Sequence, residues 1–105
     1  MAKKAKAKAT SKPAARNVGD PILEIGKAYL IRTVTHYYTG RLVAITAGEL
    51  LLEDAAWIAD TGRYSDSLLS GELNEIEPYP GEVVVFRGAC VDASEWNHAL
   101  PRTRK

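Results

Sequence analysis

The stretch YLIRTVTHYYTGRLVAITAG, residues 29–48, decides the fold of this chain. Residues 29–38 are dense in β-branched and aromatic side chains, a composition that favours a half-buried strand. Thr39-Gly40 signals a turn, Arg41–Thr46 is expected as a second strand, and Ala47-Gly48 signals a second turn. Two closely spaced turns between short strands predict an antiparallel meander.

The next segment, residues 49–59, fits two structures. Its Ala, Leu and Glu content favours a helix, and Thr46 with Glu49 could form a capping box. Its apolar run Leu50-Leu51-Leu52 also fits a short buried strand, and periodicity does not separate the two for so short a run. We expect a strand over residues 50–54.

The remainder of the chain continues in short elements. One helical turn is expected at residues 66–69, and an extended piece at 73–77 should end at Pro78, because a residue before proline is pushed to extended angles. Residues 83–86, Val-Val-Val-Phe, form the clearest strand in the chain. Gly88 should interrupt it before a last strand at 89–93, and Trp96 and Leu100 should pack back onto the domain.

Charge is distributed unevenly along the 105 residues. Residues 17–100 hold all 13 acidic residues and five basic ones, a net charge of −8. The two ends hold nine cations and no acid: Lys3, Lys4, Lys6, Lys8, Lys12, Arg16, Arg102, Arg104 and Lys105. These tails can contact acidic protein surfaces or, without sequence preference, nucleic acid phosphates. The alternative is a tail that only aids solubility and has no further function.

These features predict three parts: a basic Ala/Lys-rich tail, disordered or extended, over 1–20, one β domain over 21–100, and a basic tail over 101–105. We expect neither a signal peptide nor a membrane span. The single cysteine, Cys90, excludes an internal disulfide.

The order of the expected strands resembles the Sm-like small barrel, a relative in shape of SH3-like barrels. The matching residues are Gly40-Arg41-Leu42 in the second strand, Leu52-Glu53-Asp54-Ala55 in the third, and Arg87-Gly88 after the hydrophobic strand 83–86. The resemblance implies a mainly β fold, a small antiparallel barrel of five to six strands. Gly40, Leu42, Arg87 and Gly88 would be its motif residues, and the glycines would lie where a bent sheet excludes a Cβ.

The chain also departs from the Sm-like pattern. The loop Thr46–Glu49 lacks the Asp and Asn with which that family holds bases, and a lysine tail replaces its N-terminal helix. A second resemblance, carried by LEDAAWIADTGR (residues 52–63) and NEIEP (74–78), is to small proteins encoded by tailed bacteriophages. It implies a virion or assembly role by association.

No pattern predicts a catalytic, metal or cofactor site. His36, Cys90 and His98 lack the paired spacing of zinc ligands, and we expect them to be structural or surface residues. Carboxylates at 53, 54, 60 and 66 would have to converge for acid–base chemistry, and ion pairs or a solvated face are the simpler expectation. The aromatic residues could stack bases but fit a core or protein interface better. The interface candidates are Trp57, Arg63, Tyr64 and Tyr79.

The sequence therefore favours a non-catalytic structural protein, such as a capsid decoration or head–tail component of a tailed phage. It would be assembled in the host cytoplasm, located in the virion and docked onto neighbouring protein subunits in an oligomeric assembly. The alternatives are an Sm-like ring that binds RNA, and a small cytoplasmic regulator that binds a host protein through its acidic face.

Overall fold

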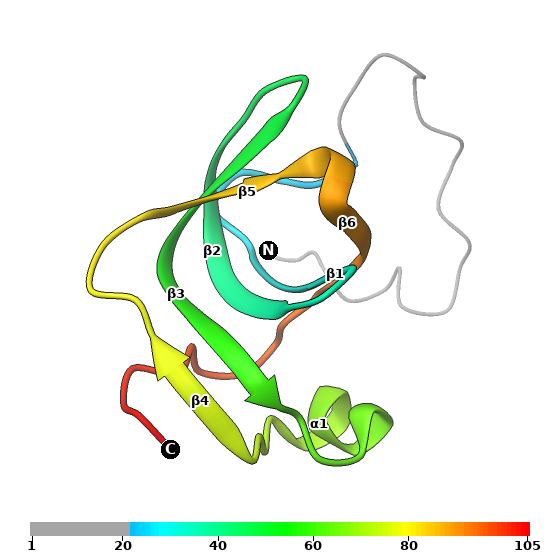
Figure 1. Ribbon diagram of the computed structural model, residues 1–105, viewed down its shortest axis with the longest axis vertical. Helices are drawn as coiled ribbons and strands as arrows, with labels where there is room; N and C mark the ends of the chain where they lie inside the picture. The colour runs from blue at the N-terminus through cyan, green and yellow to red at the C-terminus, as the bar shows by residue number, and fades with distance from the viewer. Residues whose placement is uncertain (1–21) are drawn as a thin grey trace, which may run out of the picture.

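The computed structural model describes residues 22–105 (Figure 1). This part of the chain is mainly β, with six strands in one antiparallel sheet and one short α-helix. The predicted basic tail, with its residues 1–20, lies outside the described residues. The elements in chain order are β1 (Ala28–Thr33), β2 (Tyr37–Ile45), β3 (Glu49–Asp60), α1 (Tyr64–Ser70), β4 (Glu75–Pro78), β5 (Val83–Phe86), the 3-10 turn η2 (Arg87–Ala89) and β6 (Cys90–Glu95).

The long strand β3 organises the sheet. Its first half pairs with β5 and its second half with β4, both on the edge opposite β2, and the sheet continues through β1 to β6. Between the two halves, Asp54 adopts a positive φ of 50°. There the pairing with β2 shifts by one residue, from Arg41 opposite Glu53 to Thr39 opposite Ala56. This β-bulge bends β3, so that its two halves belong to different parts of a curved sheet.

The expected turn at Thr39-Gly40 is wrong, because both residues lie inside β2. The reversal comes earlier, at residues 34–36, where the Thr33 N–H donates to the His36 carbonyl oxygen at 2.7 Å. Gly40 has another role. A Cβ at this position would lie 3.1 Å from Cβ of Leu52 and 3.3 Å from Cβ of Ala55, so the glycine allows β2 and β3 to approach closely.

Most other predicted elements are present with shifted bounds. The strand expected at 50–54 is confirmed and extends over all of β3, which resolves the helix alternative for residues 49–59. The helical turn at 66–69 is the centre of α1, and the extended piece before Pro78 is β4. The strand at 83–86 is confirmed as β5. The last strand begins one residue later than expected and reaches Glu95, because η2 takes up the residues around Gly88.

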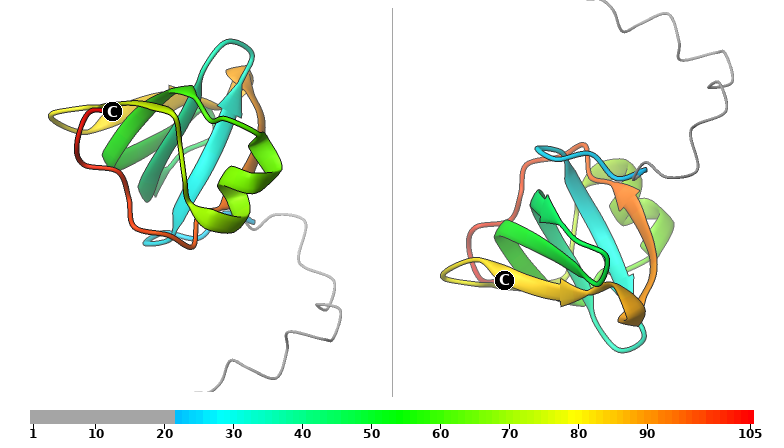
Figure 2. Two further views of the ribbon diagram at one scale, coloured as in Figure 1. Left: turned by 90° about the horizontal axis from the view of Figure 1, so that it is seen from below. Right: turned by 90° about the horizontal axis from the view of Figure 1, so that it is seen from above.

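Two apolar clusters pack on opposite faces of the sheet. The first lies inside its curve and includes Leu42, Leu50, Leu52 and Val85. The second has Tyr64 and Leu68 of α1 packed against it, and Figure 2 shows α1 beside the sheet. This second cluster contains Trp96, with Leu100 packed against it, so the expectation that these residues fold back on the domain is confirmed.

Among residues 22–105 the sheet is curved but does not close into a complete barrel, contrary to the expected closed sheet. The 3-10 turn η2 joins β5 to β6 at a corner and not through a hairpin, so the two strands do not pair with each other. β5 pairs with β3, and β6 pairs with β1.

Candidate docking surfaces

An apolar strip crosses the outer face of three strands. Ala44 of β2 stands opposite Leu51 of β3, and Leu51 stands opposite Val84 of β5. Directly opposed residues of an antiparallel sheet share a face, so these three side chains are neighbours. Val84 is 47% exposed and Phe86, two residues further on β5, is 64% exposed. We call Ala44, Leu51, Val84 and Phe86 the outer strip.

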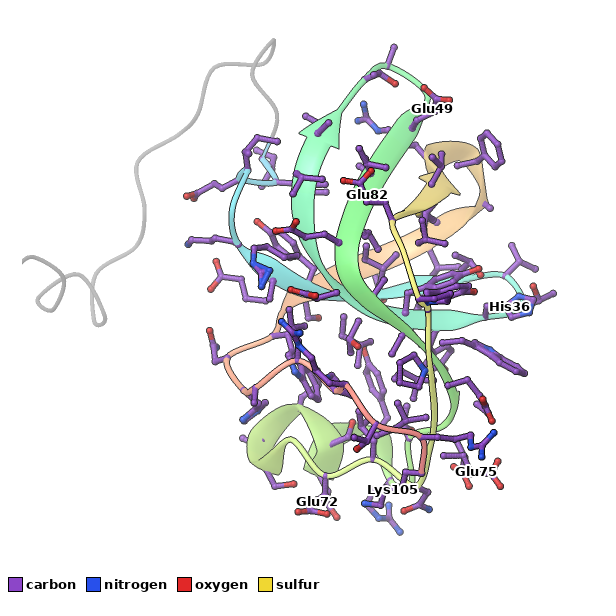
Figure 3. The ribbon with its side chains drawn as sticks, turned by 90° about the vertical axis from the view of Figure 1, so that its left-hand side faces the viewer. His36, Glu49, Glu72, Glu75, Glu82 and Lys105 are labelled. Atoms are coloured by element: carbon purple, nitrogen blue, oxygen red, sulfur yellow. The ribbon has the colours of Figure 1, made fainter. Side chains whose placement is uncertain are left out.

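The outer strip contains a shallow recess and is bordered by carboxylates. The recess has a volume of about 180 Å³, and its lining residues are Ala44, Thr46, Glu49, Leu51 and Val84. Glu49 stands opposite Phe86 at the start of β3, and Glu82 precedes β5; both are labelled in Figure 3. An apolar centre with a charged rim is the usual arrangement of a protein interface.

The outer strip is a candidate docking surface that the sequence analysis missed, although the sequence carries a signal for it. Leu50-Leu51-Leu52 and Val83–Phe86 are unbroken apolar runs, whereas a strand with one face in water alternates apolar and polar residues. In each run, alternate side chains face the core: Leu50 and Leu52 in the first run and Val85 in the second. The intervening side chains face outward, so both runs are apolar on a face that nothing in the described chain covers.

A row of aromatic rings lines a second part of the surface. The Trp57 and His36 ring centroids are 5.6 Å apart, His36 and Tyr38 6.1 Å, and Tyr38 and Tyr79 6.2 Å. Trp57 is 36% exposed, while Tyr38 and Tyr79 are half-buried and border the first core cluster. Burial, together with Tyr38, raises the pKa of Tyr79. The interface candidates Trp57 and Tyr79 therefore belong to one continuous row.

The other two interface candidates lie elsewhere. Tyr64 begins α1 and packs edge-on against Tyr37, with centroids 5.9 Å apart. The Arg32 guanidinium lies 5.1 Å from the Tyr64 ring centroid. Tyr64 is thus already held by a cation–π contact within the domain. Arg63 precedes α1 as its N-cap residue and is exposed.

Arg32 of β1 also forms a two-point ion pair with Asp92, which stands opposite it on β6. Its Nε donates to Oδ1 of Asp92 at 2.8 Å, and its Nη2 donates to Oδ2. These hydrogen bonds lower the pKa of Asp92 below its ordinary value. This pair joins β1 to β6 and holds Arg32 against the tyrosines.

The C-terminal basic residues contact the domain itself. Arg102 forms an ion pair with Asp54 at 2.9 Å, and Lys105 forms one with Glu72 at 3.5 Å. The Lys105 backbone exchanges two 3.0 Å hydrogen bonds with Ile76 of β4. Arg104 is exposed. The segment 101–105 therefore runs along the outer edge of β4, near Glu72 and Glu75 (Figure 3). The predicted contact residues Lys3, Lys4, Lys6, Lys8, Lys12 and Arg16 lie outside the described residues.

The carboxylates considered for catalysis are dispersed over the fold. Glu53 and Asp54 both accept hydrogen bonds from Arg41, at 3.1 and 2.8 Å. Asp60 accepts the N–H of Gly62 at 2.9 Å, and Asp66 lies in the first turn of α1. The arrangement joins strands and turns and does not collect these groups around one cleft.

The histidines and the cysteine are also separated. His36 lies in the β1–β2 turn and Cys90 begins β6, where burial raises the pKa of its thiol. His98 hydrogen-bonds the Leu68 carbonyl oxygen at 2.8 Å and packs against the Trp96 ring at 4.8 Å. Across residues 22–105, no three His, Cys, Asp or Glu side chains are grouped in a way that could hold a metal ion.

The residues that carry the Sm-like resemblance have distinct roles. Leu42 is fully buried in the first core cluster beside Gly40. Arg87 fastens η2 to the β2–β3 turn: its backbone N–H donates to the Gly48 carbonyl oxygen at 2.9 Å and its Nη1 donates to that of Thr46. At Gly88 a Cβ would meet nothing within 4 Å, so the steric reason expected for this glycine is wrong.

Because comparison with known proteins gives no match, the function of this chain is inferred from the surfaces described above. No protein-family model matches the chain, and no curated protein or solved structure is significantly similar to it. No helix within residues 22–105 is long and apolar enough to cross a membrane.

Proposed function

We propose that this chain is a non-catalytic docking subunit of a larger protein assembly, and that the outer strip is its contact with a neighbouring protein subunit. The observation that carries this proposal is the exposure of Val84 and Phe86 beside Leu51 on strands whose inner faces are already packed. Contiguous exposed apolar side chains rimmed by charge mark interaction sites in soluble proteins.

The size of the outer strip favours an assembly over an isolated pair. Fully burying a Val, Leu or Phe side chain contributes about 1.5–3 kcal/mol. Association itself costs about 4–15 kcal/mol, so one small strip holds a partner only weakly. A subunit with a second exposed surface, the row from Trp57 to Tyr79, can bind several neighbours at once, and each contact then supports the others.

The assembly we favour is the particle of a tailed phage, with this chain as a decoration, stabilising or head–tail component. The resemblance of residues 52–63 and 74–78 to small phage proteins supports this, and so does a basic tail beside an acidic domain. The test is to purify mature particles from cells that make this chain and to quantify it by mass spectrometry. A fixed number of copies per particle is expected, and its absence from mature particles would contradict the virion role.

A second candidate is an Sm-like or SH3-like small barrel that forms a ring and binds RNA. The observation in its favour is the strand order β6-β1-β2-β3-β5. In the described chain this order leaves β5 and β6 with one paired neighbour each. Unpaired strand edges can pair with another copy. Light scattering of the full chain separates the candidates, because the ring requires six or seven copies and affinity for uridine- or adenine-rich single strands.

A further inference from the structure

A second recess lies at the far end of β3, beyond its pairing with β2. The last residue of β3 that pairs with β2 is Ile58, opposite Tyr37, where β2 begins. Beyond it β3 continues to Asp60 without a neighbour on that side. The recess has a volume of about 270 Å³. Its lining residues are Thr35, Tyr37, Trp57, Ile58, Ala59, Asp60 and Thr61.

The chemistry of the recess suits a cation. Trp57, the more exposed of the two tryptophans, lines it, and the indole face attracts ammonium and guanidinium groups more strongly than other rings. Asp60 adds a carboxylate whose hydrogen-bond donors are both neutral: the Gly62 N–H at 2.9 Å and Nδ2 of Asn74 at 3.5 Å. Within residues 22–105, Asp60 forms no ion pair, so its charge is not compensated.

Two acids of β4 extend the same negative region. Glu75 stands opposite Asp60 and Glu77 opposite Trp57. Neither forms an ion pair with a described residue. Lys105 contacts Ile76 of β4 through its backbone, but its ammonium group is paired with Glu72. The guanidinium of Arg32 lies 6.0 Å from the ring centroid of Tyr37, which lines the recess, but it is paired with Asp92. The recess therefore has Trp57 and the unpaired carboxylate of Asp60 in its lining, and two further carboxylates, Glu75 and Glu77, lie on the neighbouring strand β4.

We propose that this recess binds a cationic side chain from residues 1–16 of this same chain. That segment holds six cations and no acid, opposite in charge to the net −8 of residues 17–100. Twenty-one residues precede Ile22, and at about 3.3 Å per extended residue they span up to about 70 Å. The folded part measures 38 Å in its longest dimension, so the segment reaches the recess within one molecule or on a second copy.

The test uses the full chain and the two indole N–H signals in NMR. Trp57 reports on the recess, while Trp96, which is 4% exposed and bonded to the Ala99 carbonyl oxygen at 3.1 Å, serves as internal control. Replacement of all six cations of residues 1–16 by glutamine should shift the signals of Trp57 and of residues 59–61 and leave Trp96 unchanged. About 1 M NaCl, where the Debye length is ~3 Å, should shift the same signals in the unaltered chain.

Single substitutions locate the contact. Asp60→Asn keeps the oxygen that accepts the Gly62 N–H. In this variant, replacement of the six cations by glutamine should no longer shift the indole N–H signal of Trp57. Asp66→Asn removes a matched acid on α1 and should retain that response. Dilution distinguishes the two arrangements, because only binding to a second copy depends on concentration. An unchanged Trp57 signal, a response that persists in Asp60→Asn, or equal shifts of both tryptophans would each overturn the proposal. None of these outcomes bears on the outer strip.

Discussion

Leu51 of β3 stands directly opposite Val84 of β5 on the outer face of the sheet, while the residues that follow each of them, Leu52 and Val85, are buried in the core. The two strands are thus apolar on both faces, and only one face is covered within the described chain. The fold accounts for the inner face. For the outer face, we propose contact with another protein.

The inner and outer leucines of β3 should differ sharply in their effect on stability. Leu52 is fully buried, so Leu52→Ala should lower the free energy of unfolding by about 2–5 kcal/mol. Leu51→Ala should cost less than about 1 kcal/mol, since the side chain is only half-buried in the isolated chain. Urea denaturation of both variants measures the difference. Equal losses would mean that Leu51 belongs to the core of the monomer.

Gly40 and Gly88 should respond differently to the same added methyl group. Gly40→Ala places a Cβ 3.1 Å from Cβ of Leu52, and it should destabilise the fold by about 1–3 kcal/mol. At Gly88 a Cβ meets nothing, so Gly88→Ala should change stability by less than about 0.5 kcal/mol. Thermal unfolding followed by circular dichroism compares the two, and similar melting temperatures would contradict the close approach of β2 and β3.

Asp54 should contribute more to stability than its neighbour Glu53. It occupies the bulge at φ 50° and receives hydrogen bonds from Nη1 and Nη2 of Arg41, together with an ion pair from Arg102. Asp54→Asn keeps a residue type that tolerates a positive φ, so any loss of stability comes from the missing negative charge. We expect the free energy of unfolding to fall by about 1 kcal/mol. Glu53→Gln should cost less than about 0.5 kcal/mol. If the two variants unfold at the same urea concentration, the Asp54 cluster has no special role.

The Arg32–Asp92 pair should make stability depend on pH in the acid range. The hydrogen bonds from Arg32 hold the pKa of Asp92 below its ordinary value of 3.8. A carboxylate with a lower pKa in the folded state stabilises that state above the ordinary pKa, and the contribution disappears as pH falls through the folded-state pKa.

Asp92→Asn should therefore be less stable than the unaltered chain at pH 6. The difference should be small, because Asp92 is 43% exposed in its side chain, and it should vanish as pH falls below 4. Urea unfolding at a series of pH values measures it. A gap that stays constant down to pH 2 would show that the substitution acts through packing and not through the ion pair.

Local composition predicted the strands well where propensity and pairing agree. Residues 83–86 are β-branched or aromatic throughout and form β5 as expected. Gly40 was misread as a turn because glycine serves both reversals and close strand contacts, and only the position of Leu52 in the neighbouring strand separates the two.

The candidate sites were harder to predict for the same reason. Trp57 and Tyr79 were singled out by residue type, and the fold joins them into one aromatic row through His36 and Tyr38. The outer strip was missed because Val84 and Leu51 look like core residues until the pairing of β3 with β5 fixes which side each faces. Long-range register, and not local sequence, places these side chains.

Site-specific cross-linking from position 84 tests the docking role most directly. A photoreactive amino acid is introduced at Val84 on the outer strip, or at Asp66 on α1 as a control, and the purified assembly that contains the chain is irradiated. We expect position 84 to cross-link to one protein subunit at a fixed ratio and position 66 to give little product. Equal yields from both positions, or no product from position 84 in an assembly of fixed stoichiometry, would contradict the proposed contact.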